Sequence, residues 1–81
     1  MTLQQAKKDA KAKLDRAGLP YTGIRAKTVS FEDLARGEAI FVWVRGIDFQ
    51  VDTDARIEAI KRIRESIPKP SLGGYILKTE G

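Results

Sequence analysis

An uninterrupted apolar run, Ala39 to Val44, constrains the fold of this chain more than any other feature. A strand with one face in water alternates apolar and polar residues, whereas a continuous apolar run is typical of a strand buried on both faces. The segment Glu38 to Arg45 is therefore predicted to lie at the centre of a sheet. Each of the two faces of this strand must then be buried by another part of the chain or by another molecule.

The length of the chain limits how much of the sheet its own helices and loops can bury. Its 81 residues are expected to make one domain, 1–81. A domain of this size buries only about 60 to 65% of the surface of its unfolded chain, so its stability depends on efficient packing or on a second subunit. The composition, 42% hydrophobic and 32% charged, is that of an ordinary globular domain. We therefore expect one folded domain that forms a homo-oligomer or binds another protein partner.

The chain contains no cysteine and no histidine. Disulfides, zinc sites built on thiolates or imidazoles, cysteine nucleophiles and the usual general base at neutral pH are thereby excluded. We expect no enzyme activity, no cofactor and no metal. Because carboxylates can catalyse without histidine, a small carboxylate-based enzyme is kept as a third alternative.

Charge and hydropathy indicate a soluble, cytoplasmic protein without membrane contact. The N-terminal residues lack the apolar stretch of a signal peptide, and six consecutive apolar residues are far fewer than the roughly 20 that cross a membrane. The net charge of +4 attracts polyanions but does not identify one.

The N-terminal segment predicts an amphipathic helix. Thr2 and Gln5 have the spacing of a capping box, and Gly18 followed by Pro20 ends the helix near Ala17. The apolar residues lie within a narrow arc made mostly of alanine, so we expect close packing against the support of the helix. They are Leu3, Ala6, Ala10, Leu14 and Ala17.

Two elements are predicted before the central strand. Tyr21 to Val29 is an expected strand, and its glycine and polar residues favour an edge position or a bulge. Ser30 to Arg36 is expected to form one or two helical turns that Ser30 starts and Gly37 stops.

The segment Ile47 to Val51 leaves two alternatives open. Its apolar residues alternate with polar ones, as in a strand with one wet face. It is either a separate strand after a turn at Arg45 and Gly46 or a continuation of the central strand past a bulge.

The residues that follow give the strongest helix prediction. Asp52 or Thr53 caps this second helix, four isoleucines form its apolar face, and Pro68 ends it. The isoleucines are Ile57, Ile60, Ile63 and Ile67. After a flexible connection, Tyr75 to Lys78 is the expected last strand.

Together these elements predict an α+β fold. We expect a small two-layer sandwich, with two amphipathic helices on one face of a mixed or antiparallel sheet of three or four strands. The order is helix, strand, short helix, strand, optional strand, helix, strand. With both helices on one face, the other face of the central strand stays uncovered unless another molecule meets it.

Three patterns that resemble chemical motifs have simpler structural explanations. Ser66 and Lys69 have the S-x-x-K spacing of serine acyl-enzymes, but here the serine closes a helix. The Gly73-Gly74 pair is expected to form a loop or bulge, because no helix follows it to bind a phosphate. Acidic residues around the start of the second helix offer oxygen ligands; they are Asp48, Asp52, Asp54 and Glu58. Their order is not that of an EF-hand loop, and helix capping and the helix dipole explain Asp52 and Asp54.

Basic residues supply candidate contacts. Lys7, Lys8 and Lys11 cluster on one side of the first helix, although the mixed charges around that helix are typical of a solvated face. Arg56 and Arg64 lie within or beside the isoleucine face, where they either cover the edge of the core or contact a partner.

The uncovered strand face supports the leading hypothesis, a non-enzymatic protein-interaction module that self-associates. The sequence leaves open which of the two alternating sets of strand residues forms the contact, so both sets are candidates together with two arginines. The candidate interface residues are Ile40, Phe41, Val42, Trp43, Val44, Arg56 and Arg64. Aromatic residues on RNA-binding sheets stack bases, but this segment lacks the RNP motif, and packing is the preferred role of its rings. The alternative is a nucleic-acid-binding domain that uses Lys7, Lys8, Lys11, Lys61, Arg62 and Lys69.

Overall fold

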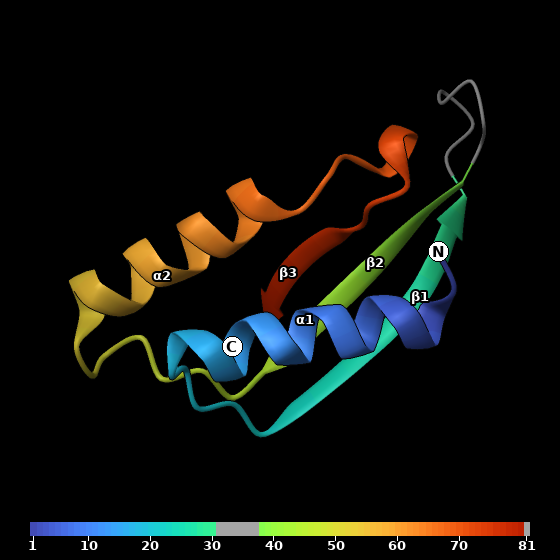
Figure 1. The fold of residues 1–81 in the computed structure, drawn as a ribbon. Coiled ribbons are helices and arrows are strands. Elements are labelled where there is room, and N and C mark those ends of the chain that lie inside the picture. Colours follow the sequence, from blue (N-terminus) through green and yellow to red (C-terminus); the bar gives the residue numbers. More distant parts are fainter. Residues whose placement is uncertain (31–37, 81) are drawn as a thin grey trace.

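The computed structural model describes residues 1–30 and 38–80, which form two helices, a three-stranded mixed sheet and one short 3₁₀ turn (Figure 1). In chain order the elements are α1 (Leu3–Ala17), β1 (Gly23–Ser30), β2 (Glu38–Arg45), α2 (Thr53–Ser66), η1 (Pro70–Leu72) and β3 (Ile76–Glu80). The predicted α+β class is confirmed. The helix predicted for Ser30 to Arg36 falls outside the described residues except for Ser30, which is the last residue of β1.

The apolar segment β2 is the central strand, as its continuous hydrophobicity predicted. The sheet order is β1-β2-β3, with β1 antiparallel and β3 parallel to β2. A parallel neighbour needs a long crossover, and the chain between β2 and β3 contains α2. The register pairs Trp43 with Arg25 on one side and with Lys78 on the other.

Helix α1 forms as its sequence indicates. The Thr2 hydroxyl accepts a hydrogen bond from the Gln5 amide at 3.1 Å, and the Gln5 side chain accepts one from the Thr2 amide at 2.9 Å. Gly18 ends the helix in the left-handed conformation, at a φ of 69°. The buried stripe is narrower than predicted, because Ala6, Ala10 and Leu14 are fully buried while Leu3 and Ala17 are exposed.

One hydrophobic core joins both helices to one face of the sheet. It contains the buried residues of α1 together with Val42 and Val44 of β2 and Leu77 of β3. Helix α2 contributes Ile60 and Ile63. Ile57, predicted to belong to the same apolar face, is 52% exposed, because the helix presents only part of its isoleucine stripe to the core. In Figure 1, α1 lies in front of β1 and β2.

The segment Ile47 to Val51 is a loop, so both strand alternatives for it are wrong. The Asp48 carboxylate accepts a hydrogen bond from the Gln50 amide at 2.9 Å. This bond turns the backbone locally and competes with strand pairing. Ile47 is buried in the core, so its hydrophobicity serves packing from a loop. Helix α2 then starts after Asp52, which occupies the cap position at a φ of 46° without a side-chain capping bond.

A side-chain hydrogen bond joins α1 to the residue before β3. The Tyr75 hydroxyl donates a 2.6 Å hydrogen bond to Asp9 on α1, and Lys13, one turn further along that helix, approaches the same carboxylate at 3.0 Å. Tyr75 is only 3% exposed, so its ring fills the core while its hydroxyl meets this partner. Within residues 1–30 and 38–80, no helix is both long and apolar enough to cross a membrane.

Candidate binding face of the sheet

The structure settles which residues of the central strand share a face. Val42 and Val44 are fully buried in the core, and Ile40 packs against it. Phe41 and Trp43 alternate with them and therefore project from the opposite face, which we call the second face. Among the described residues, no side chain of the second face belongs to the core that includes the helices. The sequence left open which alternating set of strand residues forms the contact, and Phe41 and Trp43 are the set that lies outside the core.

The two rings lie together at the centre of the second face. Their centroids are 5.5 Å apart, with an interplanar angle of 31°. The guanidinium carbon of Arg25 lies over the Trp43 ring at 4.6 Å from its centre, and the Lys78 ammonium lies 5.9 Å from the centre of the Phe41 ring. Basic side chains from both neighbouring strands therefore cover much of the aromatic surface, and each ring is only partly exposed.

The second face carries four cations and one carboxylate among its described residues. The carboxylate is Glu80, which contacts Arg25 at 2.5 Å and Arg45 at 3.6 Å. The hydrogen bond from Arg25 and the nearby guanidinium charges lower the pKa of Glu80. Within the described part of the chain, no carboxylate pairs with the other two cations, Lys27 and Lys78. The face therefore has an excess of positive charge on both sides of the rings.

A shallow hollow lies beside Trp43 at one end of this face. Its volume is about 310 Å³. Arg25 and Glu80 line it together with Arg45 and with Thr22 and Gly23 from the start of β1. The hollow places cationic, aromatic and hydrogen-bonding groups around one open space.

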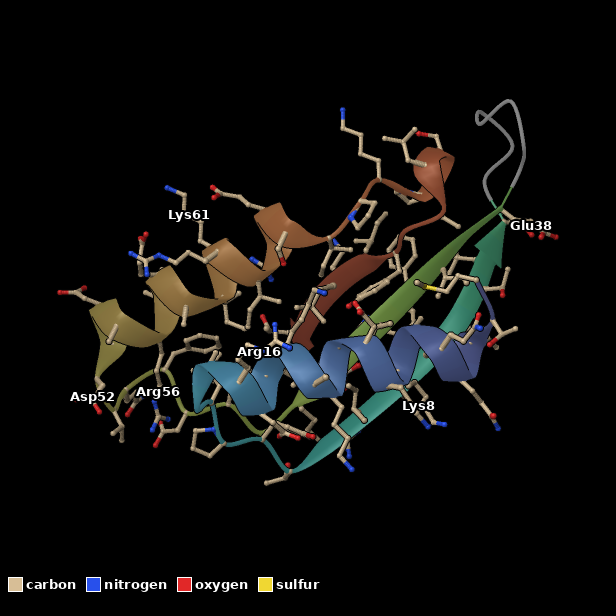
Figure 2. All side chains as sticks on the ribbon, in the orientation of Figure 1. Lys8, Arg16, Glu38, Asp52, Arg56 and Lys61 are labelled. Atoms are coloured by element: carbon tan, nitrogen blue, oxygen red, sulfur yellow. The ribbon has the colours of Figure 1, made fainter. Side chains whose placement is uncertain are left out.

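The lysines of α1 occupy a different surface. Lys7, Lys8 and Lys11 do share one side of the helix, where they border an open hollow together with Ile24 of β1. Lys61 and Arg62 belong to α2, and Lys69 follows that helix. Figure 2 shows Lys8 and Lys61 projecting away from each other. The six basic residues predicted to bind nucleic acid therefore come from three separate segments and do not form one patch.

Arg56 and Arg64 both have partners within the chain. The Arg56 guanidinium donates to the Asp48 carbonyl at 2.6 Å and so ties the loop after β2 to the first turn of α2. The Arg64 guanidinium donates to the Leu77 carbonyl at 3.2 Å and satisfies an acceptor on β3, an edge strand. These bonds supply structural roles for the two arginines, away from Phe41 and Trp43.

The glycine pair has a structural explanation too. Gly73 ends η1 at a φ of 85°, and a side chain on Gly74 would overlap the backbone carbonyl of Pro68. Gly74 also donates its amide to the Lys69 carbonyl at 3.0 Å. Gly73 therefore permits a left-handed backbone and Gly74 permits a close approach of two backbone segments, both of which are common uses of glycine.

The remaining chemical motifs do not assemble into sites. The Ser66 hydroxyl donates to the Ile63 carbonyl of its own helix at 2.7 Å, as is common for serine near a helix end. Among residues 1–30 and 38–80, no group of three or more acidic residues is arranged to hold a metal ion. Asp48 instead bonds to its own loop.

None of the five charged residues of the second face was among the predicted site residues; they are Arg25, Lys27, Arg45, Lys78 and Glu80. The alternation of Arg25 and Lys27 in a strand was visible in the sequence, but what they lie beside depends on register. Pairing with β2 brings Arg25 to Trp43 and Lys27 to Phe41. Such long-range pairing has no local sequence signal.

No protein-family model matches the chain, and neither the curated proteins nor the solved structures contain a significant match to it.

Proposed function

We propose that this protein is a non-enzymatic binding module and that the second face of its sheet is the contact surface. The observation that carries the proposal is the Phe41 and Trp43 pair, 5.5 Å apart on the central strand and bordered by cations. The proposal takes the fold as two layers, with both helices over the face of Val42 and Val44, and the shared core supports that arrangement.

The pKa values of Asp9 and Glu80 do not favour a role as a general acid for either group. Burial raises the pKa of Asp9, but the hydrogen bond from Tyr75 and the Lys13 ammonium outweigh it and leave that pKa below its ordinary value. The pKa of Glu80 is lowered as well. A general acid at neutral pH needs a raised pKa, so these two groups favour the role of ionised hydrogen-bond acceptors.

Self-association through the same face, expected from the apolar strand, is the second candidate. Partly exposed aromatic rings favour it, because such rings are enriched at protein interfaces. The charges of the face oppose it. In a two-fold dimer the same patch meets itself, which brings Lys27 and Lys78 of one copy towards those of the other.

Mapping the contact surface by NMR tests the proposal. Backbone amide shifts of the ¹⁵N-labelled protein would be followed over a concentration series, on addition of a twelve-residue polyglutamate, and on addition of the oligonucleotide (dT)12. We expect at least one titration to perturb β1, β2 and β3 around Arg25, Trp43 and Lys78. Perturbations that cluster on the outer surfaces of α1 or α2, or no perturbation in any of the three titrations, would disprove the assigned surface.

A further inference from the structure

We infer that the second face binds single-stranded nucleic acid, with bases stacking against the Arg25 guanidinium and the Trp43 ring that it covers, and with phosphates contacting Lys27 and Lys78. The inference rests on the proposed function, because it names the partner of that same surface. It assigns nucleic-acid binding to the sheet rather than to the lysines of α1.

A planar, exposed cation lies over the tryptophan of the second face. The guanidinium carbon of Arg25 is 4.6 Å from the centre of the Trp43 ring, and the Arg25 side chain is 59% exposed. Bases stack on aromatic side chains and on the planar guanidinium of arginine, without regard to sequence. The Arg25 guanidinium and the Trp43 ring beneath it therefore form one stacked pair. This pair on β1 and β2 offers a planar group against which a base can stack.

The positions of the cations match a charged backbone. Lys27 lies beside Phe41 on β1, and Lys78 lies beside Trp43 on β3. Neighbouring strands are about 4.8 Å apart, so these ammonium groups flank the rings within side-chain reach of phosphates on either side of a stacked base. Neither lysine has a carboxylate partner among the described residues, so no described carboxylate competes with a phosphate for either ammonium group.

The geometry favours a single strand over the other occupants. Base stacking on the rings requires bases that are not already stacked in a duplex. A polyglutamate chain satisfies the cations but supplies no flat ring to stack against Arg25 and Trp43. A second copy of the chain supplies rings but adds like charge to a face that already carries four cations and one carboxylate. Only single-stranded nucleic acid complements both features.

The chain contains one tryptophan, so its emission reports directly on this site. Titration of the full chain with (dT)12 and with (rU)12 at 50 mM salt is expected to quench Trp43 fluorescence as bases stack on the ring. Contact with two or three phosphates predicts that the affinity falls about 7- to 20-fold between 50 and 200 mM salt. Comparison of the two oligonucleotides shows whether DNA or RNA binds more tightly, and quenching by either supports the inference.

Variants separate stacking from charge. Binding of fluorescein-labelled (dT)12 would be followed by anisotropy. We expect Trp43→Leu to weaken it about 5- to 150-fold, and Trp43→Phe, which keeps a ring, to weaken it less. Lys27→Glu is expected to weaken binding and to reduce its salt dependence. Lys61→Glu makes the same charge change on α2 and is the matched control, with little expected effect. Circular dichroism of each variant checks that it folds, and Lys27→Glu, at an exposed position, tests the site if Trp43→Leu does not fold.

The possible outcomes have distinct meanings. If Trp43→Leu folds and binds (dT)12 as tightly as the parent, and inorganic polyphosphate competes equally well, charge alone explains binding and the inference is wrong. If neither oligonucleotide binds while polyglutamate or a second copy perturbs the second face, the inference fails but the proposed function stands. If no probe perturbs that face, both are wrong.

Discussion

The Tyr75 hydroxyl donates a 2.6 Å hydrogen bond to the Asp9 carboxylate and so joins the first helix to the residue before the last strand. The two residues are 66 positions apart, the largest separation of any side-chain hydrogen bond among the described residues. Burial and the Asp9 hydrogen bond raise the pKa of Tyr75, which keeps its hydroxyl protonated as a donor. This bond secures α1 against the end of the chain that forms β3.

Replacing Tyr75 by phenylalanine tests the strength of that link. Tyr75→Phe keeps the ring in the core but removes the donor to an ionised acceptor, so we expect the free energy of unfolding to fall by about 1 to 2 kcal/mol. Urea denaturation measures the change. Tyr21→Phe is the control, because the Tyr21 hydroxyl makes no hydrogen bond to the described residues. Equal losses in the two variants would contradict the assigned role.

The lowered pKa of Asp9 predicts an acid-dependent loss of stability. Burial opposes the shift, but the Tyr75 hydrogen bond and the Lys13 ammonium prevail. A carboxyl whose pKa is lower in the folded state stabilises the fold above its unfolded pKa, near 3.8, and loses that contribution as the pH falls through the folded value. The stability difference between the parent and Asp9→Asn should therefore be largest near neutral pH and shrink below about pH 4. Urea midpoints from pH 2 to 7 measure it, and a constant difference would contradict the assignment.

The two adjacent glycines should respond differently to alanine. At Gly74 a methyl group overlaps the fixed backbone of Pro68, so we expect a loss of about 3 kcal/mol, the upper end of overpacking costs. At Gly73 a methyl group meets open space and only the left-handed backbone is unfavourable, so we expect about 1 kcal/mol. Thermal and urea denaturation of Gly74→Ala and Gly73→Ala give the comparison. A larger loss at Gly73 would show that the close approach at Pro68 is wrong.

Two isoleucines of α2 should contribute unequally to stability. Ile60 is 3% exposed in the core, and Ile60→Ala is expected to lower the free energy of unfolding by about 2 to 4 kcal/mol. Ile57 is 52% exposed, so we expect Ile57→Ala to cost less than about 1 kcal/mol. Equal losses, measured by urea denaturation, would restore the four-isoleucine face that the sequence predicted.

Arg25 is expected to shield the Trp43 ring from water. Arg25→Ala removes the guanidinium over that ring, so the emission of the folded protein should shift to the red. The lost cation–π contact lowers the free energy of unfolding by about 0.5 to 1 kcal/mol. Arg62→Ala removes an exposed arginine that pairs with Glu58 on α2 and should leave the emission unchanged. An unchanged spectrum in Arg25→Ala would argue against cover by the guanidinium.

Patterns among residues that are close together in the sequence predicted most of the helices and strands. The capping box of Thr2 and Gln5, the left-handed Gly18 and the end of α2 before Pro68 depend on neighbours within one helical turn. The continuous hydrophobicity of β2 likewise indicated a central strand. The strand prediction for Ile47 to Val51 was wrong. The Gln50 amide donates a hydrogen bond to the Asp48 carboxylate, which turns the backbone into a loop despite the alternating apolar residues.

Local pattern was thus enough for the helices, their ends and the central position of β2, since each depends on backbone preferences or on hydrophobicity within a few residues. Only the tertiary structure decided the candidate site. A continuous apolar run carries no alternation to tell Val42 and Val44 from Phe41 and Trp43, so the buried face was decided by the core that Val42 and Val44 share with residues of both helices. The strand register determines which side chains lie beside Phe41 and Trp43 on the second face. Pairing with β1 and β3 brings Arg25 and Lys78 there from distant parts of the chain.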